Sequence, residues 1–130
     1  MKICTDISQS NKFLDLGIDI NTSDMMWIAL NWQETDYYME VKNDGFEMPK
    51  RYIPAWSLSA LMELIPPYLG ELDAGIDFSF GKAIHSKWYS AYYLQYFQDG
   101  GVMAVKTVTG DTAVDAAFEM VVWLKESGKI

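Results

Sequence analysis

The amino-acid sequence predicts a single α+β domain over residues 1–130, with a twisted antiparallel sheet of about five strands and helices packed mainly on one face. Three observations predict this fold class. Five segments have the polar–apolar alternation or the aromatic content of strands. Three others combine apolar residues at helical spacing with capping residues at their ends. Half of the 130 residues are hydrophobic, which is enough for one core in a chain of this length.

The first predicted helix covers about residues 6–16 and ends at Gly17. A glycine here can take the left-handed conformation that closes a helix, and Ile18 beyond it would then pack back on Phe13. The face expected to be buried is only moderately apolar and consists of Ile7, Ser10 and Leu14.

The second predicted helix begins after Ser57, whose hydroxyl is a favoured N-cap. Trp56 before the cap and Leu61 four positions inside the helix match a hydrophobic staple. Pro66 ends the helix, because the residue before a proline avoids helical geometry. Its apolar positions at helical spacing are Leu58, Leu61, Met62 and Ile65.

The last predicted helix follows Thr112, which forms a capping-box-like pair with Asp115, and Gly128 closes it. Apolar side chains, Trp123 among them, cover most of its circumference, whereas a surface helix needs an apolar arc of only about 100°. A sheet must therefore cover one side, and another helix or a second subunit the other. We expect either a twofold homodimer or cover by the first helix and the loop over residues 43–54.

Two aromatic-rich runs predict a β-hairpin, because Met25–Trp32 and Tyr37–Lys42 flank the polar loop Gln33–Asp36. Turn chemistry follows at Asn43–Gly45. Farther along the chain, apolar and polar residues alternate over residues 76–80, as in a half-buried strand. A returning strand is expected over Val102–Thr109, after the glycines at positions 100 and 101.

The segment over residues 88–97 is the most aromatic part of the chain, and its spacing suits either a strand or a helix. Aromatic residues favour strands, so we predict a strand and keep a helix as the alternative. In a strand, successive side chains point to opposite faces, so one face would pack under the last helix. The other face would be either an amphipathic edge beside the core or an exposed aromatic platform for a partner protein, a base or a sugar. The candidate interaction surface consists of Trp88, Tyr92 and Tyr96 on one face with Tyr89 and Tyr93 on the other.

Charge argues against two classes of partner. The chain has 10 Lys+Arg against 18 Asp+Glu, a net charge of −8, and no basic cluster beyond Lys50-Arg51. Nucleic acids and anionic membranes both require a concentrated positive surface, so neither is expected to bind. The most apolar stretch, Ala113–Leu124, is 12 residues long and contains two carboxylates, which is too short to span a bilayer. With a polar N-terminus and no partner for Cys4, these features predict a soluble, cytoplasmic protein.

Searches for catalytic and metal-binding patterns find little support. Cys4 and His85 form the one possible thiol–imidazole pair, and no Gly-x-Ser-x-Gly motif is present. The stretch Asp19–Asp24 is faintly similar to a calcium loop but lacks its glycine. Gly100-Gly101 lacks the spacing and the lysine of a phosphate-binding loop. We therefore expect no catalytic residue, no cofactor and no metal.

Three stretches of the chain together carry a family resemblance. They are Leu14–Asp19 with Thr22–Met25, then Pro54–Leu61 ending at Ile65-Pro66, and Asp111–Ala117 ending at Val122–Leu124. Over nearly its full length the chain resembles small proteins encoded by phages, prophages and mobile elements of gut Bacteroidetes. The resemblance implies an intracellular accessory protein and assigns no activity, cofactor or functional residue. The same stretches also have a structural explanation, because they contain the helix caps, the hydrophobic staple and core residues described above.

The sequence supports three hypotheses about function. The leading one is a small non-enzymatic binding protein that acts through protein–protein contacts and self-associates. An alternative is a small-molecule-binding protein or enzyme with a Tyr/Trp pocket, which would require a cleft with convergent polar groups. A further alternative is an acidic mimic that occupies the nucleic-acid groove of another protein. The acidic bias of residues 1–48, with 9 Asp+Glu against 3 Lys, is the one observation for it.

Overall fold

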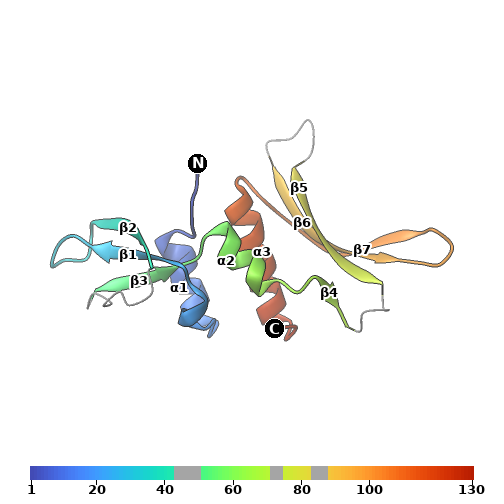
Figure 1. The fold of residues 1–130 in the computed structure, drawn as a ribbon, viewed down its shortest axis with the longest axis horizontal. Helices are drawn as coiled ribbons and strands as arrows, with labels where there is room; N and C mark the ends of the chain where they lie inside the picture. Colours follow the sequence, from blue (N-terminus) through green and yellow to red (C-terminus); the bar gives the residue numbers. More distant parts are fainter. Residues whose placement is uncertain (43–50, 71–74, 83–87) are drawn as a thin grey trace.

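The computed structural model describes residues 1–42, 51–70, 75–82 and 88–130 (Figure 1). This part of the chain contains three α-helices, a short 3-10 helix and seven strands in two sheets. The helices are α1 (Ile7–Asp15), η1 (Ile20–Thr22), α2 (Leu58–Leu64) and α3 (Ala113–Glu126). The strands are β1 (Met25–Ala29), β2 (Tyr37–Val41), β3 (Tyr52–Ala55), β4 (Tyr68–Leu69), β5 (Ile76–Lys82), β6 (Tyr89–Tyr96) and β7 (Val102–Gly110).

The α+β class predicted from the sequence is confirmed, but the strands are divided between two antiparallel sheets instead of forming one. The first has the order β2-β1-β3 and the second the order β4-β5-β6-β7. The α-helices lie between the two sheets, and the β6–β7 hairpin extends away from them at one end of the molecule (Figure 1). The main core is therefore built around the helices and closed by the second sheet.

The predicted hairpin in the first sheet is confirmed, with Ala29 paired to Tyr37. Its loop covers residues 30–36 and is longer than the polar segment alone, because β1 ends before Leu30. The prediction of a loop through Pro54 is wrong, because residues 52–55 form β3 on the other side of β1. Proline is tolerated there because β3 is an edge strand, where a missing N–H breaks no ladder. Asn43–Gly45 lies outside the described residues.

The second sheet confirms the strand prediction for the aromatic segment, and the helical alternative is wrong. β6 is a central strand that pairs with β5 over seven residues and with β7 on its other side. The pairing with β7 shifts register between Tyr93 and Leu94, because Tyr93 faces Lys106 and Leu94 faces Ala104. Val105 is the extra residue of this bulge, which bends the free end of the hairpin.

The first helix begins and ends as predicted. Asp6 caps it with a reciprocal box to Gln9, and Gly17 has a φ of 77°. The N–H of Ile18 donates to the Phe13 carbonyl (3.0 Å), so the two side chains meet in the core. The predicted buried face is wrong in part, because Leu14 is exposed and Phe13 is buried. Ser10 is buried as expected, and its hydroxyl lies 2.8 Å from that of Thr5.

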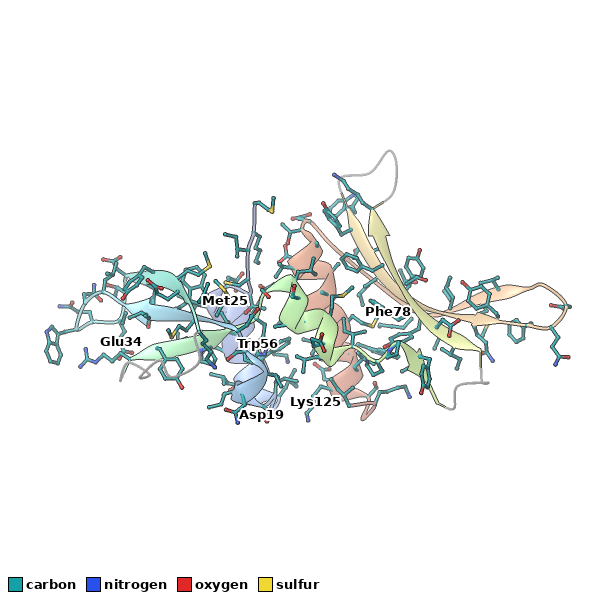
Figure 2. The ribbon with its side chains drawn as sticks, in the orientation of Figure 1. Asp19, Met25, Glu34, Trp56, Phe78 and Lys125 are labelled. Carbon is teal, nitrogen blue, oxygen red and sulfur yellow. The ribbon has the colours of Figure 1, made fainter. Side chains whose placement is uncertain are left out.

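The second helix confirms the predicted cap and staple. The Ser57 hydroxyl accepts the N–H of Ala60 (3.3 Å), and both Trp56 and Leu61 are fully buried. Ile65, before the proline, has a ψ of 116° and lies outside the helix. Trp56 lies where the first sheet meets the helices (Figure 2).

The last helix is covered on several sides, as its apolar circumference requires. β6 and β7 pack on one side of α3 and α2 on another. From α1, Phe13 stacks on Phe118 with ring centroids 5.0 Å apart. The first helix thus supplies cover within one chain, which confirms that part of the second expectation. Cover by residues 43–50 lies outside the described residues. Trp123 is only partly buried. The homodimer itself stays a prediction.

An ion pair joins the N-terminal segment to α3. The Lys2 ammonium lies 2.6 Å from a carboxylate oxygen of Asp115, which also accepts the Gln9 side chain (2.9 Å). Burial alone would raise the pKa of Asp115, but the hydrogen bonds from Lys2, Gln9 and Thr112 outweigh it and hold that pKa below its usual value. A lowered folded-state pKa stabilises the fold above the unfolded-state pKa, and this stabilisation is lost as pH falls through the folded-state pKa.

We therefore expect Asp115→Asn to lower the free energy of unfolding by about 1 kcal/mol at pH 6 and by less at pH 3. Urea unfolding at both pH values measures the difference. Glu126→Gln is the control, because the Glu126–Lys12 pair is half-exposed at 3.5 Å and should contribute little at either pH. An equal loss for Asp115→Asn at both pH values would contradict the assignment.

Candidate interaction surface

The five aromatic residues singled out from the sequence lie in three different environments. Strand alternation separates them as predicted, because Tyr89 and Tyr93 point toward the helices and Tyr92 and Tyr96 point to the opposite face. Trp88, immediately before β6, is 55% exposed. The structure therefore does not bring all five residues together on one surface.

Tyr93 belongs to the core. Its side chain is fully buried between Phe78, with ring centroids 5.4 Å apart, and Trp123, at 6.1 Å. Its hydroxyl donates a hydrogen bond to the Pro66 carbonyl oxygen (2.6 Å), which satisfies the one polar atom of the ring. Burial raises the pKa of Tyr93 to about 12, so the hydroxyl stays protonated. This residue holds the sheet against the end of α2.

Tyr89 lies at the edge of the same face. Its ring stacks at 6.3 Å on Phe80, and the Lys82 ammonium is 5.4 Å from the ring centroid. Tyr89 also lines a cleft of about 590 Å³ between the sheet, the first residues of α2 and α3, and the N-terminal residues 1–3. The sequence could not indicate this cleft, because its walls come from segments far apart in the chain.

The opposite face of the second sheet has an apolar central row. Tyr92, Leu94 and Tyr96 alternate along β6 on this face. Tyr92 is flanked by the small residues Ser79 and Thr107, and Leu94 by Asp77 and Ala104. None of the described helices covers this face, and Tyr96 is 48% exposed. We call Tyr92, Leu94 and Tyr96 the outer row.

The outer row adjoins an exposed apolar hairpin end, for which the sequence pattern predicted only a returning strand. Val102 lies opposite Tyr96 and shares the face of the outer row, whereas Met103 lies opposite Gln95 and points to the other face. β7 is an edge strand of the sheet, and its first four residues are all exposed. An apolar run of four residues should have suggested a strand buried on both faces or an exposed contact surface. The large exposed apolar side chains here are Phe97 (44%), Val102 (53%), Met103 (52%) and Val105 (37%).

A second exposed apolar site lies at the far end of the molecule, on the β1–β2 loop. Trp32 is 84% exposed and Leu30 64%. The Arg51 guanidinium lies 4.3 Å from the Trp32 ring centroid. Glu34, two residues after Trp32 in the same loop, has a positive φ of 56°. Figure 2 shows Glu34 at this end, away from the helices. The sequence pattern predicted only that Trp32 ends a strand, whereas β1 ends at Ala29.

The residues weighed for metal binding or catalysis are engaged in structural contacts. Asp19 accepts the N–H of Asn21 (2.9 Å) and caps η1, and Asp24 accepts the N–H of Ser57 (2.8 Å). In the described part of the chain, no group of three His, Cys, Asp or Glu residues could hold a metal ion. Burial, with a smaller contribution from Asp24, raises the pKa of Cys4 to about 11, which disfavours the thiolate. His85 lies outside the described residues.

Comparison with known proteins adds no assignment. No protein-family model, curated protein or solved structure matches the chain. The resemblance to proteins of phages and mobile elements therefore stays a prediction. Among the described residues, no helix has the length and hydropathy needed to cross a membrane.

Proposed function

We propose that this chain is a small non-enzymatic binding protein that acts in the cytoplasm through protein–protein contacts, as an accessory protein of a phage or mobile element. The observation that carries the binding role is the outer row beside the exposed apolar end of the β6–β7 hairpin. Exposed apolar side chains gathered at one end of a sheet favour contact with another protein.

The composition of the surface favours a protein over other partners. Tyrosine and phenylalanine are enriched at protein interfaces, and the outer row with the hairpin end contains both. Aromatic rings could also stack on bases, but a net charge of −8 opposes the approach of a polyanion. A protein partner needs no such positive field.

The free edge of β7 indicates the form of the partner. An edge strand presents unpaired N–H and C=O groups that an extended segment can pair with, while side chains beside the edge provide specificity. The bulge at Val105 divides this edge, and α3 packs along β7 on one side. The distal part, Val102–Ala104, is thus the more open. We assign the surface to an extended apolar segment of another protein.

The test compares two exposed tyrosines at opposite ends of the molecule. Tyr96→Ser removes the outer-row ring, while Tyr38→Ser removes a ring of 40% exposure on β2 in the other sheet. A partner captured by the wild-type chain is identified, purified and titrated against each variant by calorimetry. We expect Tyr96→Ser to weaken binding about tenfold or more and Tyr38→Ser to change it less than about twofold. Equal affinities for the two variants would contradict the assignment.

Self-association is measured separately, because a second copy could occupy the same surface. In sedimentation equilibrium at micromolar concentration, a mass near 14.8 kDa at every loading supports a distinct partner. A mass near twice that value, restored to the monomer by Tyr96→Ser but not by Tyr38→Ser, assigns the outer row to a homodimer instead. That result would overturn the distinct partner, and it would confirm the homodimer expected from the sequence.

A further inference from the structure

The cleft beside Tyr89 is separate from the outer row. It lies on the helix-facing side of the second sheet and is lined by residues 1–3, 57–59 and 111–114, with Lys82 and Tyr89. Its volume of about 590 Å³ falls within the range of roughly 300–1,000 Å³ that is usual for small-ligand sites. Five segments of the chain meet there, so the cleft exists only in the folded protein.

The walls of the cleft are mainly apolar. Ile3 comes from the N-terminal segment, Leu58 from the first turn of α2 and Val114 from the first turn of α3. The ring of Tyr89 forms the wall on the sheet side. An apolar body placed among these side chains would remove both apolar surfaces from water, which favours binding.

The charged side chains that line the cleft differ in whether they already have an ion-pair partner. Lys2 is held at 2.6 Å by Asp115 and at 3.1 Å by Asp6, so its charge is already paired. Lys82 contacts the Tyr89 ring and forms no ion pair with a carboxylate of the described residues. Asp111 also lines the cleft, and both Asp111 and Lys82 are exposed, so solvent screens the two charges alike. Lys82 is thus the lysine of the cleft that has no carboxylate partner among the described residues.

We propose that this cleft binds a small organic carboxylate with an apolar body, of the size of a medium-chain fatty acid. The carboxylate contacts the Lys82 ammonium, and the apolar body lies against Tyr89, Leu58 and Val114. This site is independent of the proposed protein-binding surface, because Tyr89 points toward the helices while the outer row points away from them.

The test uses decanoate as the probe and decanol as its neutral counterpart, both titrated by calorimetry. We expect Lys82→Gln to weaken decanoate binding about three- to fivefold and to leave decanol binding unchanged, as for a partly exposed ion pair. Lys106→Gln is the matched control. Its ammonium lies 5.8 Å from the Trp123 ring on the same face of the sheet, and it is not among the residues that line the cleft. Equal losses for the two lysine variants would overturn the role of Lys82.

A second variant tests the location. Ser59 is exposed on the lip of the cleft, so Ser59→Trp should fold and place an indole in the space that the apolar body needs. We expect this variant to bind decanoate at least about tenfold more weakly, whereas Tyr96→Ser binds it as the wild type does. The absence of wild-type binding at millimolar decanoate would overturn the proposal, and so would undiminished binding by Ser59→Trp. Loss through Tyr96→Ser would place the probe on the outer row instead.

Discussion

Trp56→Ala is expected to lower the free energy of unfolding by about 3–5 kcal/mol, the usual cost of removing a large buried aromatic side chain. Trp56 is fully buried, and its ring meets Phe13 edge-on with centroids 4.9 Å apart. Its indole N–H donates to the Thr22 hydroxyl (2.9 Å), so the substitution leaves a cavity and also removes one hydrogen bond. A loss of this size is a large fraction of the stability of a typical domain.

Trp123→Ala is the matched comparison. Trp123 lies on the apolar arc of α3 that the sequence identified, but it is only partly buried and has the Lys106 ammonium beside its ring. We expect it to cost roughly 1–3 kcal/mol, because part of its surface is already in water and less of a cavity is left. Urea unfolding followed by far-ultraviolet circular dichroism measures both. A larger loss for Trp123→Ala than for Trp56→Ala would contradict the placement of the core.

Gly110→Ala is expected to cost at least about 2 kcal/mol, because it introduces an atom where the backbone of α3 already lies. A Cβ at Gly110 would come within 2.5 Å of the Ala116 nitrogen and 2.7 Å of the Asp115 Cβ. Neither atom can move without displacing the first turn of α3 from the end of β7. Thermal unfolding of the variant measures the loss.

Gly81→Ala serves as the control, since Gly81 lies in β5 of the same sheet and nothing stands within 4 Å of the position that an added Cβ would take. This change should alter the free energy of unfolding by less than about 0.5 kcal/mol, or raise it slightly through the less flexible unfolded chain. If both glycine variants unfold alike, the close approach of β7 and α3 is not what the structure shows.

The elements that the sequence predicts well are those with local signals. Ser57 with Trp56 and Leu61, and Gly17 with Ile18, identify helix ends from residues within one or two turns. Sheet membership depends instead on which distant strands pair, and no short window contains that information. β3 was missed for this reason, since Pro54 argues against a strand unless the strand lies at an edge.

The candidate site shows the same division. Alternation along β6 correctly separated Tyr93 from Tyr92, because the period of a strand is local. The helix α3 follows β7 and packs on one face of the second sheet. The sequence pattern does not indicate which of the two faces this is. The cleft at Tyr89 and the exposure of Val102 arise from packing between segments, so residue types alone could not identify them.

The contacts between α1 and α3 affect the order in which the protein can be completed during synthesis. Phe13 stacks on Phe118, and Lys2 pairs with Asp115, so residues near the two ends of the chain share one core. β1, β2 and β3 can pair soon after they leave the ribosome, because their partners are close in sequence. Until α3 follows, Phe13 and Trp56 have part of their surface open to water. The nascent chain therefore exposes Phe13 and Trp56 until the residues of α3 have been added, and chaperones that hold apolar surfaces could bind it during this interval.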